Sequence, residues 1–248
     1  MAAPPVVVVG GGIIGASIAY HLTLKGVTPL LIEGTSVAAA ASGKAGGFLA
    51  RDWGDGSPTE QLHRVSFAMH EQLAATLGVE SYRKLPTMSV AGGRSGGKAV
   101  PAVPWLDGQV RSCSLMDADT AQVTPRELTE KLVAAACANG ATLLAGTVQG
   151  VVSEGGGEDS DPSSASVRAV VVDGKEILAS QVVFALGPWS VLLEQWLPGQ
   201  LIPMQGVKST SVIFKHEPGS VAPFALFCEE DGNGCHLEVC SFAHGCNT

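Results

Sequence analysis

Three glycines near the start of the chain have the spacing of a phosphate-binding turn. Gly10, Gly12 and Gly15 lie in the stretch VVVVGGGIIGAS, residues 6–17, and fit the pattern G-x-G-x-x-G. Gly10 permits a tight turn, Gly12 has no Cβ to keep a pyrophosphate from the backbone, and Gly15 lets a helix pack closely against a strand. The N-terminus of such a helix offers unpaired N–H groups and a positive dipole end to an anion. These residues therefore predict a dinucleotide site.

An acidic residue follows at the position that ribose recognition requires. Glu33 ends the apolar run VTPLLIE, residues 27–33, and stands 23 positions after Gly10. A carboxylate there accepts hydrogen bonds from ribose hydroxyls and repels a 2′-phosphate, which favours FAD or NAD over NADP. Two simpler interpretations are a glycine turn that binds no ligand and a Glu33 that is only a surface acid.

The elements that would position these residues form a βαβ unit. Residues 6–9 are an unbroken apolar run, which predicts a buried parallel strand. Residues 13–25 predict a helix closed by Gly26 in the left-handed conformation, and residues 27–33 predict the second strand. This strand–helix–strand context makes the glycine pattern more specific than it is alone.

Two more helices are expected farther along the chain. Ser57 with Glu60, and Thr124 with Glu127, each fit a capping box at a helix start. Apolar side chains share one face of the first of these helices, which predicts that this face is buried: Leu62, Val65, Met69, Leu73 and Leu77.

The remaining chain is expected to be rich in strands. Residues 87–107 contain many Gly and Pro and predict loop and edge strand. Asp173 and Gly174 predict a type I′ turn between two paired strands. The apolar run VVFALG, residues 182–187, predicts a buried strand that returns to the first sheet, and the chain after Leu201 alternates in strand fashion.

The composition of the chain limits the classes of protein to which it can belong. The chain has 248 residues, 46% of them apolar and 15% charged, with a net charge of −8. These values favour a folded protein and argue against nucleic acid as a main partner. No apolar run is long enough to predict a membrane span, and no secretory signal is evident, so we expect a cytoplasmic protein.

The cysteines do not form a recognisable metal motif. The chain has six, and four of them lie in the last 21 residues. Cys235, Cys240 and Cys246 could join His244 at a zinc ion, but no C-x-x-C pair supports this alternative. We therefore expect reduced thiols and no metal site.

Four segments, taken together, resemble the FAD-dependent oxidoreductases of the D-amino-acid oxidase, glycine oxidase and sarcosine oxidase superfamily. They span most of residues 6–190 and are VVVVGGGIIGASIAYHLTLKGVTPLLIE, ASGKAGGFLA, TVQGVV and VVFALGPWS. The second segment favours FAD, because an NAD site needs no such arm. An NAD-dependent dehydrogenase would rest on the first segment alone.

The resemblance implies an α/β fold with a Rossmann-like FAD-binding domain, which has a parallel sheet, plus a β-rich (α+β) substrate domain. We place the FAD-binding domain at residues 1–85 and 120–200, and the partial antiparallel substrate domain at residues 86–119 and 201–248.

The resemblance also implies a set of cofactor-binding residues. It places the phosphates and ribose at Gly10, Gly12, Ile13, Ile14, Gly15 and Glu33. It places the middle of FAD at Ser42, Gly43, Lys44, Ala45, Gly46 and Gly47, and a backbone contact to adenine at Val148. Ala185, Gly187 and Trp189 would close over the dinucleotide, with Leu186 standing where a Thr is common.

The reaction that the resemblance implies is hydride transfer to the flavin from the carbon that bears an amine in a small-molecule substrate. Arg51 follows the flavin segment and is the candidate for binding a substrate carboxylate, because a guanidinium pairs with it bidentately. Lys44 is the candidate for stabilising anionic reduced flavin. The alternatives are a surface arginine and a solvated loop lysine.

The end of the chain departs from the family pattern. Members of the superfamily are longer and return to the FAD domain in a final strand, glycine and helix, whereas here CHLEV passes into CSFAHGCNT. This predicts a truncated chain, and the alternative function is a non-catalytic isoform that binds a dinucleotide or serves as an interaction module. SGKAGGFLA with Arg51 and Asp52 resembles a eukaryotic branch linked to endosome-to-Golgi transport, which implies an association with endosomes.

Overall fold

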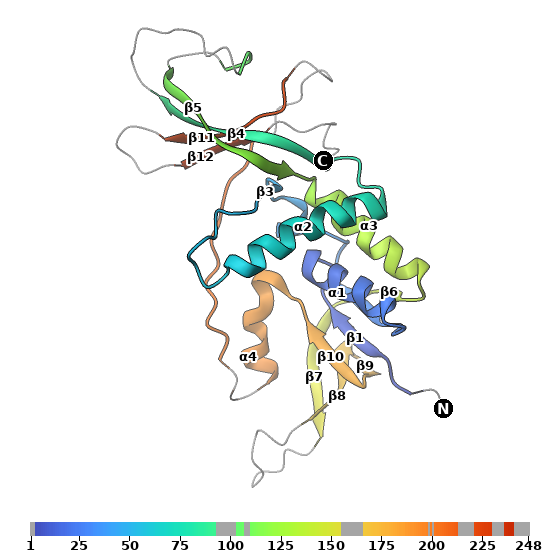
Figure 1. Ribbon diagram of the computed structural model, residues 1–248. Helices are drawn as coiled ribbons and strands as arrows, with labels where there is room; N and C mark the ends of the chain where they lie inside the picture. Colours follow the sequence, from blue (N-terminus) through green and yellow to red (C-terminus); the bar gives the residue numbers. More distant parts are fainter. Residues whose placement is uncertain are drawn as a thin grey trace. The chain divides into compact units, whose positions relative to one another are not determined.

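The computed structural model describes residues 3–92, 103–106, 110–154, 166–197, 199, 201–212, 221–229 and 236–240. The chain forms two compact units (Figure 1). The first unit comprises Met1–Ala45 and Pro125–Thr210, and the second comprises Gly46–Thr124 and Ser211–Thr248. Both units are discontinuous in sequence. Residues 46–85 fall in the second unit, whereas the domain boundaries drawn from the sequence placed them with the first.

The first unit contains a four-stranded parallel sheet. Its strands are β1 (Val6–Val9), β2 (Leu30–Glu33), β6 (Thr142–Ala145) and β10 (Gln181–Phe184), in the order β10-β1-β2-β6. Helix α1 (Ile13–Leu24) connects the first two strands, so the predicted βαβ unit is confirmed. The predicted return strand is also confirmed, because β10 pairs with β1 in parallel.

Two layers cover this parallel sheet. On one face, Val7, Val9 and Ile32 pack into a buried cluster with Val170 and Val172. The latter two come from β8 (Ser166–Val172), the central strand of an antiparallel sheet that also contains β7 (Val148–Glu154) and β9 (Lys175–Leu178). Side chains alternate along a strand, so Val8 points to the opposite face, where α1 contacts the sheet. Helix α3 (Pro125–Ala138) lies beside α1 (Figure 1).

Local sequence explains the ends of these elements. Gly26 follows α1 with a φ of +77°, which is the left-handed conformation predicted for it. Asp173 and Gly174 join β8 to β9 with φ values of +46° and +77°, as the predicted type I′ turn requires. After β10 the chain continues into two short helices, η3 (Gly187–Leu192) and α4 (Leu193–Trp196).

The second unit is built on a five-stranded mixed sheet. Its strands are β3 (Phe48–Ala50), β4 (Arg83–Gly92), β5 (Val110–Gln122), β11 (Ala225–Glu229) and β12 (His236–Cys240), in the order β12-β11-β4-β5-β3. The prediction of loop and edge strand for residues 87–107 was wrong for β4, which lies between β11 and β5. The strand tolerates Pro86 because this residue falls at a register shift between Leu85 and Thr87, where it pairs with no residue of β5.

Helix α2 (Glu60–Leu77) also differs from the prediction. It begins at Glu60 with Thr59 as N-cap, because the Ser57 hydroxyl donates to the Gly54 carbonyl oxygen and Glu60 accepts from the N–H of Gly56. The predicted apolar face is exposed at three positions, Leu62, Val65 and Met69, and the helix buries Phe67 and Ala74 instead. Gly78 ends the helix in the left-handed conformation.

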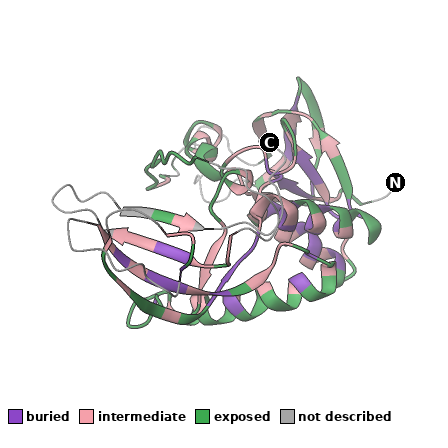
Figure 2. Ribbon diagram, turned by 90° about the horizontal axis from the view of Figure 1, so that it is seen from above, coloured by how far each residue is buried: buried purple, intermediate pink, exposed green. Residues whose placement is uncertain are grey.

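Burial follows the strands and the inner sides of the helices (Figure 2). Buried residues, in purple, gather along the strands, and exposed residues, in green, cover the outer turns of the helices. Among the residues that the structure describes, no helix is both long enough and apolar enough to cross a lipid bilayer.

Candidate functional site

The glycine turn after β1 is sterically closed to side chains at two positions. Gly10 has a φ of +110°, and a Cβ on it would overlap the carbonyl oxygen of Ala185 at the end of β10. A Cβ on Gly15 would overlap the carbonyl oxygen of Gly10 and would lie 3.3 Å from the Cβ of Ala185. The structure therefore brings Gly10, Gly15 and Ala185 together, and the close approach of strand and helix depends on both glycines.

The carboxylate of Glu33 is fixed at the end of β2. One of its oxygens accepts the N–H of Gly11 at 2.7 Å, and the other accepts the backbone N–H and the hydroxyl of Thr35 at 2.8 and 3.0 Å. These bonds use three of roughly four acceptor positions of a carboxylate. Glu33 is thus held inside the glycine turn and retains capacity to accept from a hydroxyl group.

Ser42 lies against the N-terminus of α1. Its Oγ accepts the N–H of Ile13 at 3.0 Å and would lie 3.2 Å from a Cβ on Gly12. Because Oγ acts here as an acceptor, its hydroxyl proton is available for donation to an anion. Ile14 in the same first turn is 62% exposed, so this end of the helix is open on one side.

The segment after Ser42 packs tightly at first and then becomes exposed. Ser42 and Gly43 belong to η1 (Ala41–Gly43), and a Cβ on Gly43 would overlap the carbonyl oxygen of Ala38. Lys44 and Ala45 are exposed. The next two predicted residues, Gly46 and Gly47, belong to the second unit, where they accept hydrogen bonds from Gln122 Nε2 and the N–H of Val123.

The remaining predicted residues lie at strand ends of the first unit. Val148 begins β7 and packs against the cluster that contains Ile32. The residue before it, Thr147, has its Oγ1 3.5 Å from the position of a Cβ on Gly34, so this strand begins beside Glu33. Gly187 has a φ of +55°, and Trp189 is 56% exposed.

Three residues of this neighbourhood were not predicted from the sequence. Thr35 fixes the Glu33 carboxylate. Ala38 is buried with a φ of +57° and donates its N–H to the Gly11 carbonyl oxygen. Arg126, on α3, has a guanidinium nitrogen 3.1 Å from the position of a Cβ on Gly43. Ala38 and Arg126 act on residues distant in the chain, so no local motif marks them. Thr35 is two residues after Glu33, and this proximity could have suggested it as a partner of the carboxylate.

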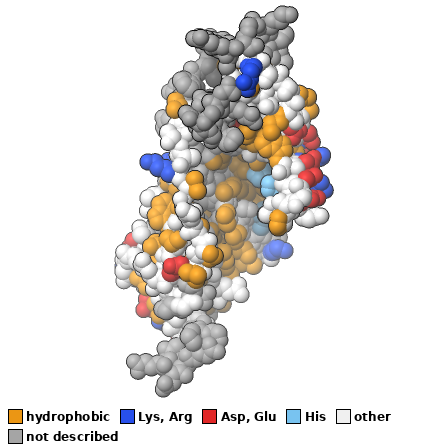
Figure 3. Space-filling view, turned by 90° about the vertical axis from the view of Figure 1, so that its left-hand side faces the viewer, with side chains coloured by type: hydrophobic (Ala, Val, Ile, Leu, Met, Phe, Trp, Pro, Cys, Tyr) orange, Lys and Arg blue, Asp and Glu red, His pale blue; other side chains and the backbone are white. Residues whose placement is uncertain are grey.

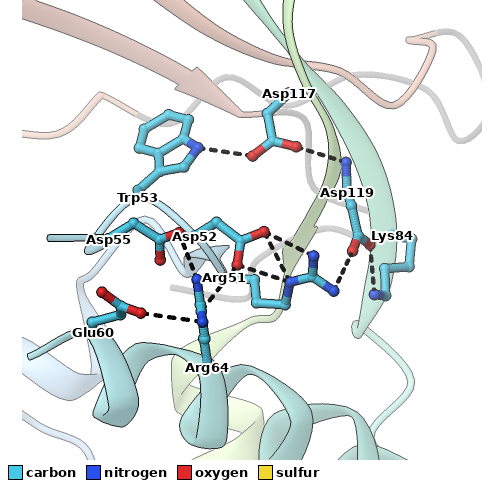
Figure 4. Close-up of polar contacts among 9 residues, drawn as sticks. All are labelled: Arg51, Asp52, Trp53, Asp55, Glu60, Arg64, Lys84, Asp117 and Asp119. Carbon is cyan, nitrogen blue, oxygen red and sulfur yellow. Dashed lines mark hydrogen bonds and ion pairs between the residues drawn. The ribbon is translucent and has the colours of Figure 1, made fainter.

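The predicted substrate-binding residue Arg51 lies in a charged cluster of the second unit (Figure 4). Its guanidinium donates to both carboxylate oxygens of Asp52 at 2.8 to 3.0 Å and lies 3.6 Å from Asp119. The hydrogen bond and the charge of Asp52 raise the pKa of Arg51, and Arg51 lowers the pKa of Asp52 in turn. Lys84 donates to Asp119 at 2.9 Å. The charge of Arg51 is therefore balanced within the protein.

A second arginine completes the charged cluster. Arg64 of α2 contacts Asp55 at 2.6 Å, Glu60 at 3.1 Å and Asp52 at 3.5 Å. A shallow hollow of about 480 Å³ is lined by Arg51, Asp52, Asp55 and Arg64. The two arginines that line the hollow are each paired with an aspartate that lines it. Their positive charges are therefore largely balanced.

Three of the four residues of the zinc alternative lie outside the described residues, namely Cys235, His244 and Cys246. Within the described ranges, no group of three or more His, Cys, Asp and Glu side chains could hold a metal ion. Burial raises the pKa of the thiols of Cys113 and Cys228 in the second unit.

Comparison with known proteins gives matches by sequence and by structure. Two curated fungal proteins match by sequence, "Putative oxidoreductase C1F5.03c" of Schizosaccharomyces pombe and "Putative oxidoreductase TDA3" of Saccharomyces cerevisiae. Each is 39% identical in an alignment of 94 residues that covers 34% of this chain. The match spans 24% of the first relative and 17% of the second.

Solved structures resemble the chain over a larger part. Glycine oxidase from Bacillus cereus has a TM-score of 0.65 at 23% identity, covering 78% of this chain and 58% of its own. L-proline dehydrogenase from P. horikoshii has a TM-score of 0.68 at 18% identity, covering 91% of this chain and 64% of its own. These likenesses confirm the predicted fold class of a Rossmann-like domain with a β-rich second unit.

The model of one protein family matches residues 5–238, nearly the whole of the chain. That family is described as FAD dependent oxidoreductase, and FAD is accordingly its cofactor. The chain therefore belongs to the DAO family of FAD-dependent oxidoreductases.

Proposed function

We propose that this protein oxidises an amine or an amino-acid-like small molecule with FAD held by the first unit. The observation that carries the proposal is the Glu33 carboxylate, which accepts the N–H of Gly11 inside the glycine turn at 2.7 Å. This bond holds an acceptor for ribose hydroxyls next to the backbone that would meet the pyrophosphate.

The residues present fit the adenosine diphosphate part of FAD. A cradle without side chains runs through Gly10, Gly12 and Gly15, and a Cβ at the first or third of these would overlap backbone. The first turn of α1 would bind the phosphates through the N–H group of Ile14, with Ser42 donating its hydroxyl proton. The N–H of Ile13 already donates to Ser42 Oγ, so Ile13 would contact a phosphate only if that bond opened. Further contacts are proposed from the family resemblance at Gly43, Lys44, Ala45, Gly46, Gly47, Val148, Ala185, Gly187 and Trp189.

When bound, FAD supplies the flavin ring that accepts a hydride from the carbon bearing the amine. The task of the protein is to bind and orient the substrate. Both carboxylate oxygens of Asp52 already accept hydrogen bonds from the guanidinium of Arg51. Arg51 can therefore bind a substrate carboxylate only if that carboxylate replaces Asp52. Lys44 is exposed and remains the proposed partner of negative charge on the flavin.

The names of structural neighbours support an amino-acid-like substrate. They include glycine oxidase from Bacillus cereus, L-amino acid deaminase from Proteus vulgaris and L-proline dehydrogenase from P. horikoshii. The chain covers 58%, 49% and 64% of these proteins, so the activity of the whole protein is part of the proposal. A cytoplasmic location with endosome association is proposed from the eukaryotic branch that the sequence resembles.

Anaerobic bleaching of bound flavin tests the proposed reaction. Purified protein reconstituted with FAD is mixed without oxygen with a panel of primary, secondary and tertiary amines and of amino acids. We expect at least one of them to bleach the visible flavin absorbance and re-aeration to restore it. If dithionite bleaches the flavin while no amine or amino acid does, the proposed reaction is wrong although FAD is bound.

A further inference from the structure

Two helices of the first unit begin beside the same short segment, η1. Ser42 of η1 accepts the N–H of Ile13, the first residue of α1, at 3.0 Å. The next residue is Gly43, and a guanidinium nitrogen of Arg126 lies 3.1 Å from the position of a Cβ on it. Arg126 is the second residue of α3. The segment η1 therefore contacts the N-terminal ends of both α1 and α3.

The same two helices run side by side in one direction. Asn139, which follows α3, donates a side-chain N–H to the hydroxyl of Thr23 near the end of α1 at 3.2 Å. Since the first turns of both helices contact η1 and their last turns contact each other, α1 and α3 are parallel (Figure 1). The positive ends of both helix dipoles consequently lie beside η1.

Arg126 is a cation at a helix end that favours anions. The first turn of a helix stabilises acidic side chains, such as Glu127 in α3, and disfavours basic ones. Glu130 lies 3.8 Å from Nη1 of Arg126, whereas Nη2 is the nitrogen beside Gly43. The side chains of Arg126 and Glu130 are 39% and 52% exposed, so this ion pair contributes little. The positive charge of Arg126 is therefore only partly balanced by Glu130.

The charge of the whole molecule opposes the binding of an anion. The chain has a net charge of −8, and Glu33 adds a carboxylate beside the glycine turn. On the described part of the face that Figure 3 draws, Lys and Arg side chains are scattered rather than gathered in a basic patch. A pyrophosphate must therefore find positive charge locally, from helix ends and single side chains. Two cations adjoin η1, the exposed Lys44 and Arg126.

We propose that Arg126 supplies positive charge to the pyrophosphate end of the cofactor site and thereby strengthens the binding of FAD. This inference rests on the proposed function, because it assigns a role at the site that the first unit would offer to FAD. Arg126 need not touch a phosphate to act in this way. It lies beside the neighbour of Ser42, and charge attraction extends over about 8–10 Å at ordinary ionic strength.

The affinity for FAD tests this role, measured by flavin fluorescence during titration of the full chain freed of flavin. Arg126→Gln should weaken binding at low ionic strength by about 3- to 10-fold, as expected when a partly exposed charge near a dianion is removed. Arg126→Lys keeps the charge and should remain within about 2-fold of wild type. Lys131→Gln is the matched control, because it removes the same charge from α3 farther along the helix, and it should change the affinity little.

Two further readouts separate charge from structural damage. Salt at about 1 M shortens the screening length to about 3 Å, so the difference between Arg126→Gln and wild type should nearly vanish. Glu130→Gln removes the carboxylate beside Nη1 and should tighten FAD binding at low salt by about 2- to 3-fold. A gain of affinity cannot come from a damaged fold, and thermal unfolding verifies that each variant folds.

Three outcomes overturn the inference. The first is an Arg126→Gln variant that binds FAD as tightly as wild type. The second is a loss of affinity that persists at high salt and is shared by Arg126→Lys, because that pattern indicates a structural role. The third is equal weakening by Lys131→Gln, which would make general charge the cause.

The flavin-bleaching experiment remains separate from this test. If the variants of Arg126 behave as expected but no amine or amino acid bleaches the flavin, the role of Arg126 stands and the proposed oxidation fails. If an amine bleaches the flavin and Arg126→Gln binds FAD like wild type, the proposed function stands and the role of Arg126 is wrong. Wild-type protein that binds no FAD contradicts both.

Discussion

Gly15→Ala should separate α1 from β1 and weaken the cofactor site without changing the charge of the protein. The added Cβ would overlap the carbonyl oxygen of Gly10 and would lie 3.1 Å from its carbonyl carbon. Both groups are backbone, so the helix must move as a body. Overpacking of this kind costs about 1–3 kcal/mol. For a chain of this size, that lowers the melting temperature by roughly 2–12 °C.

Thermal unfolding followed by far-ultraviolet circular dichroism measures this cost. Gly150→Ala is the matched control, because no atom lies within 4 Å of its added Cβ and the residue belongs to the same unit. We expect the control to change the free energy of unfolding by less than about 0.5 kcal/mol. Fluorescence titration with FAD should also show weaker binding to Gly15→Ala than to the control. Equal melting temperatures for the two variants would refute the close packing of α1 on β1.

Three further changes test separate parts of the account. Glu33→Ala removes an acceptor from the glycine turn and should weaken FAD binding by about 10- to 100-fold, equivalent to about 1–3 kcal/mol, measured by flavin fluorescence; unchanged affinity would contradict the role of Glu33. Asp52→Asn removes a carboxylate whose pKa is lowered by Arg51. A lowered pKa stabilises the fold above the ordinary value of about 3.9, so the difference in melting temperature from wild type should shrink as the pH falls below that value; a growing difference would refute it. Gly174→Ala, at a φ of +77°, should cost about 1 kcal/mol in chemical denaturation, and no cost would refute the turn.

The parallel sheet could be predicted because its signals are local. The β-branched run Val6–Val9, the glycines after it and Glu33 are all adjacent in sequence to the elements that they specify. The second unit was harder to predict from the sequence. Strand β5 contains Ser, Asp, Thr and Gln and has no clear alternation, yet it pairs with both β4 and β3. Its stability comes from neighbours rather than from its own pattern.

In α2 the pattern was clear, but the burial predicted from it was wrong. Leu62, Val65 and Met69 fit a buried stripe by period, but the helix packs through Phe67 and Ala74. Periodicity identifies an apolar face without saying what covers it.

The close packing of the glycine turn could be predicted because its motif is short. Spacing pointed to Gly10, Gly12 and Gly15 because each backbone requirement follows from a short turn. Arg126 contacts this neighbourhood from α3, more than a hundred residues after Gly15, and Ala38 contributes through a positive φ that its residue type does not signal. The ion pair of Arg51 with Asp119 likewise depends on the pairing of β5, which the sequence did not reveal.

The central claim is that the glycine turn binds FAD, and the visible absorption spectrum of the purified protein after gel filtration tests it most directly. Gly12→Val is the companion variant, because the nearest atom to a Cβ at this position is Ser42 Oγ at 3.2 Å, so the fold should tolerate a side chain that keeps the pyrophosphate away. We expect a flavin spectrum in the wild-type protein, retained or regained with added FAD, and its loss in the folded Gly12→Val variant. Colourless wild-type protein that gains no flavin with excess FAD, or equal flavin content in the two proteins, would contradict the claim.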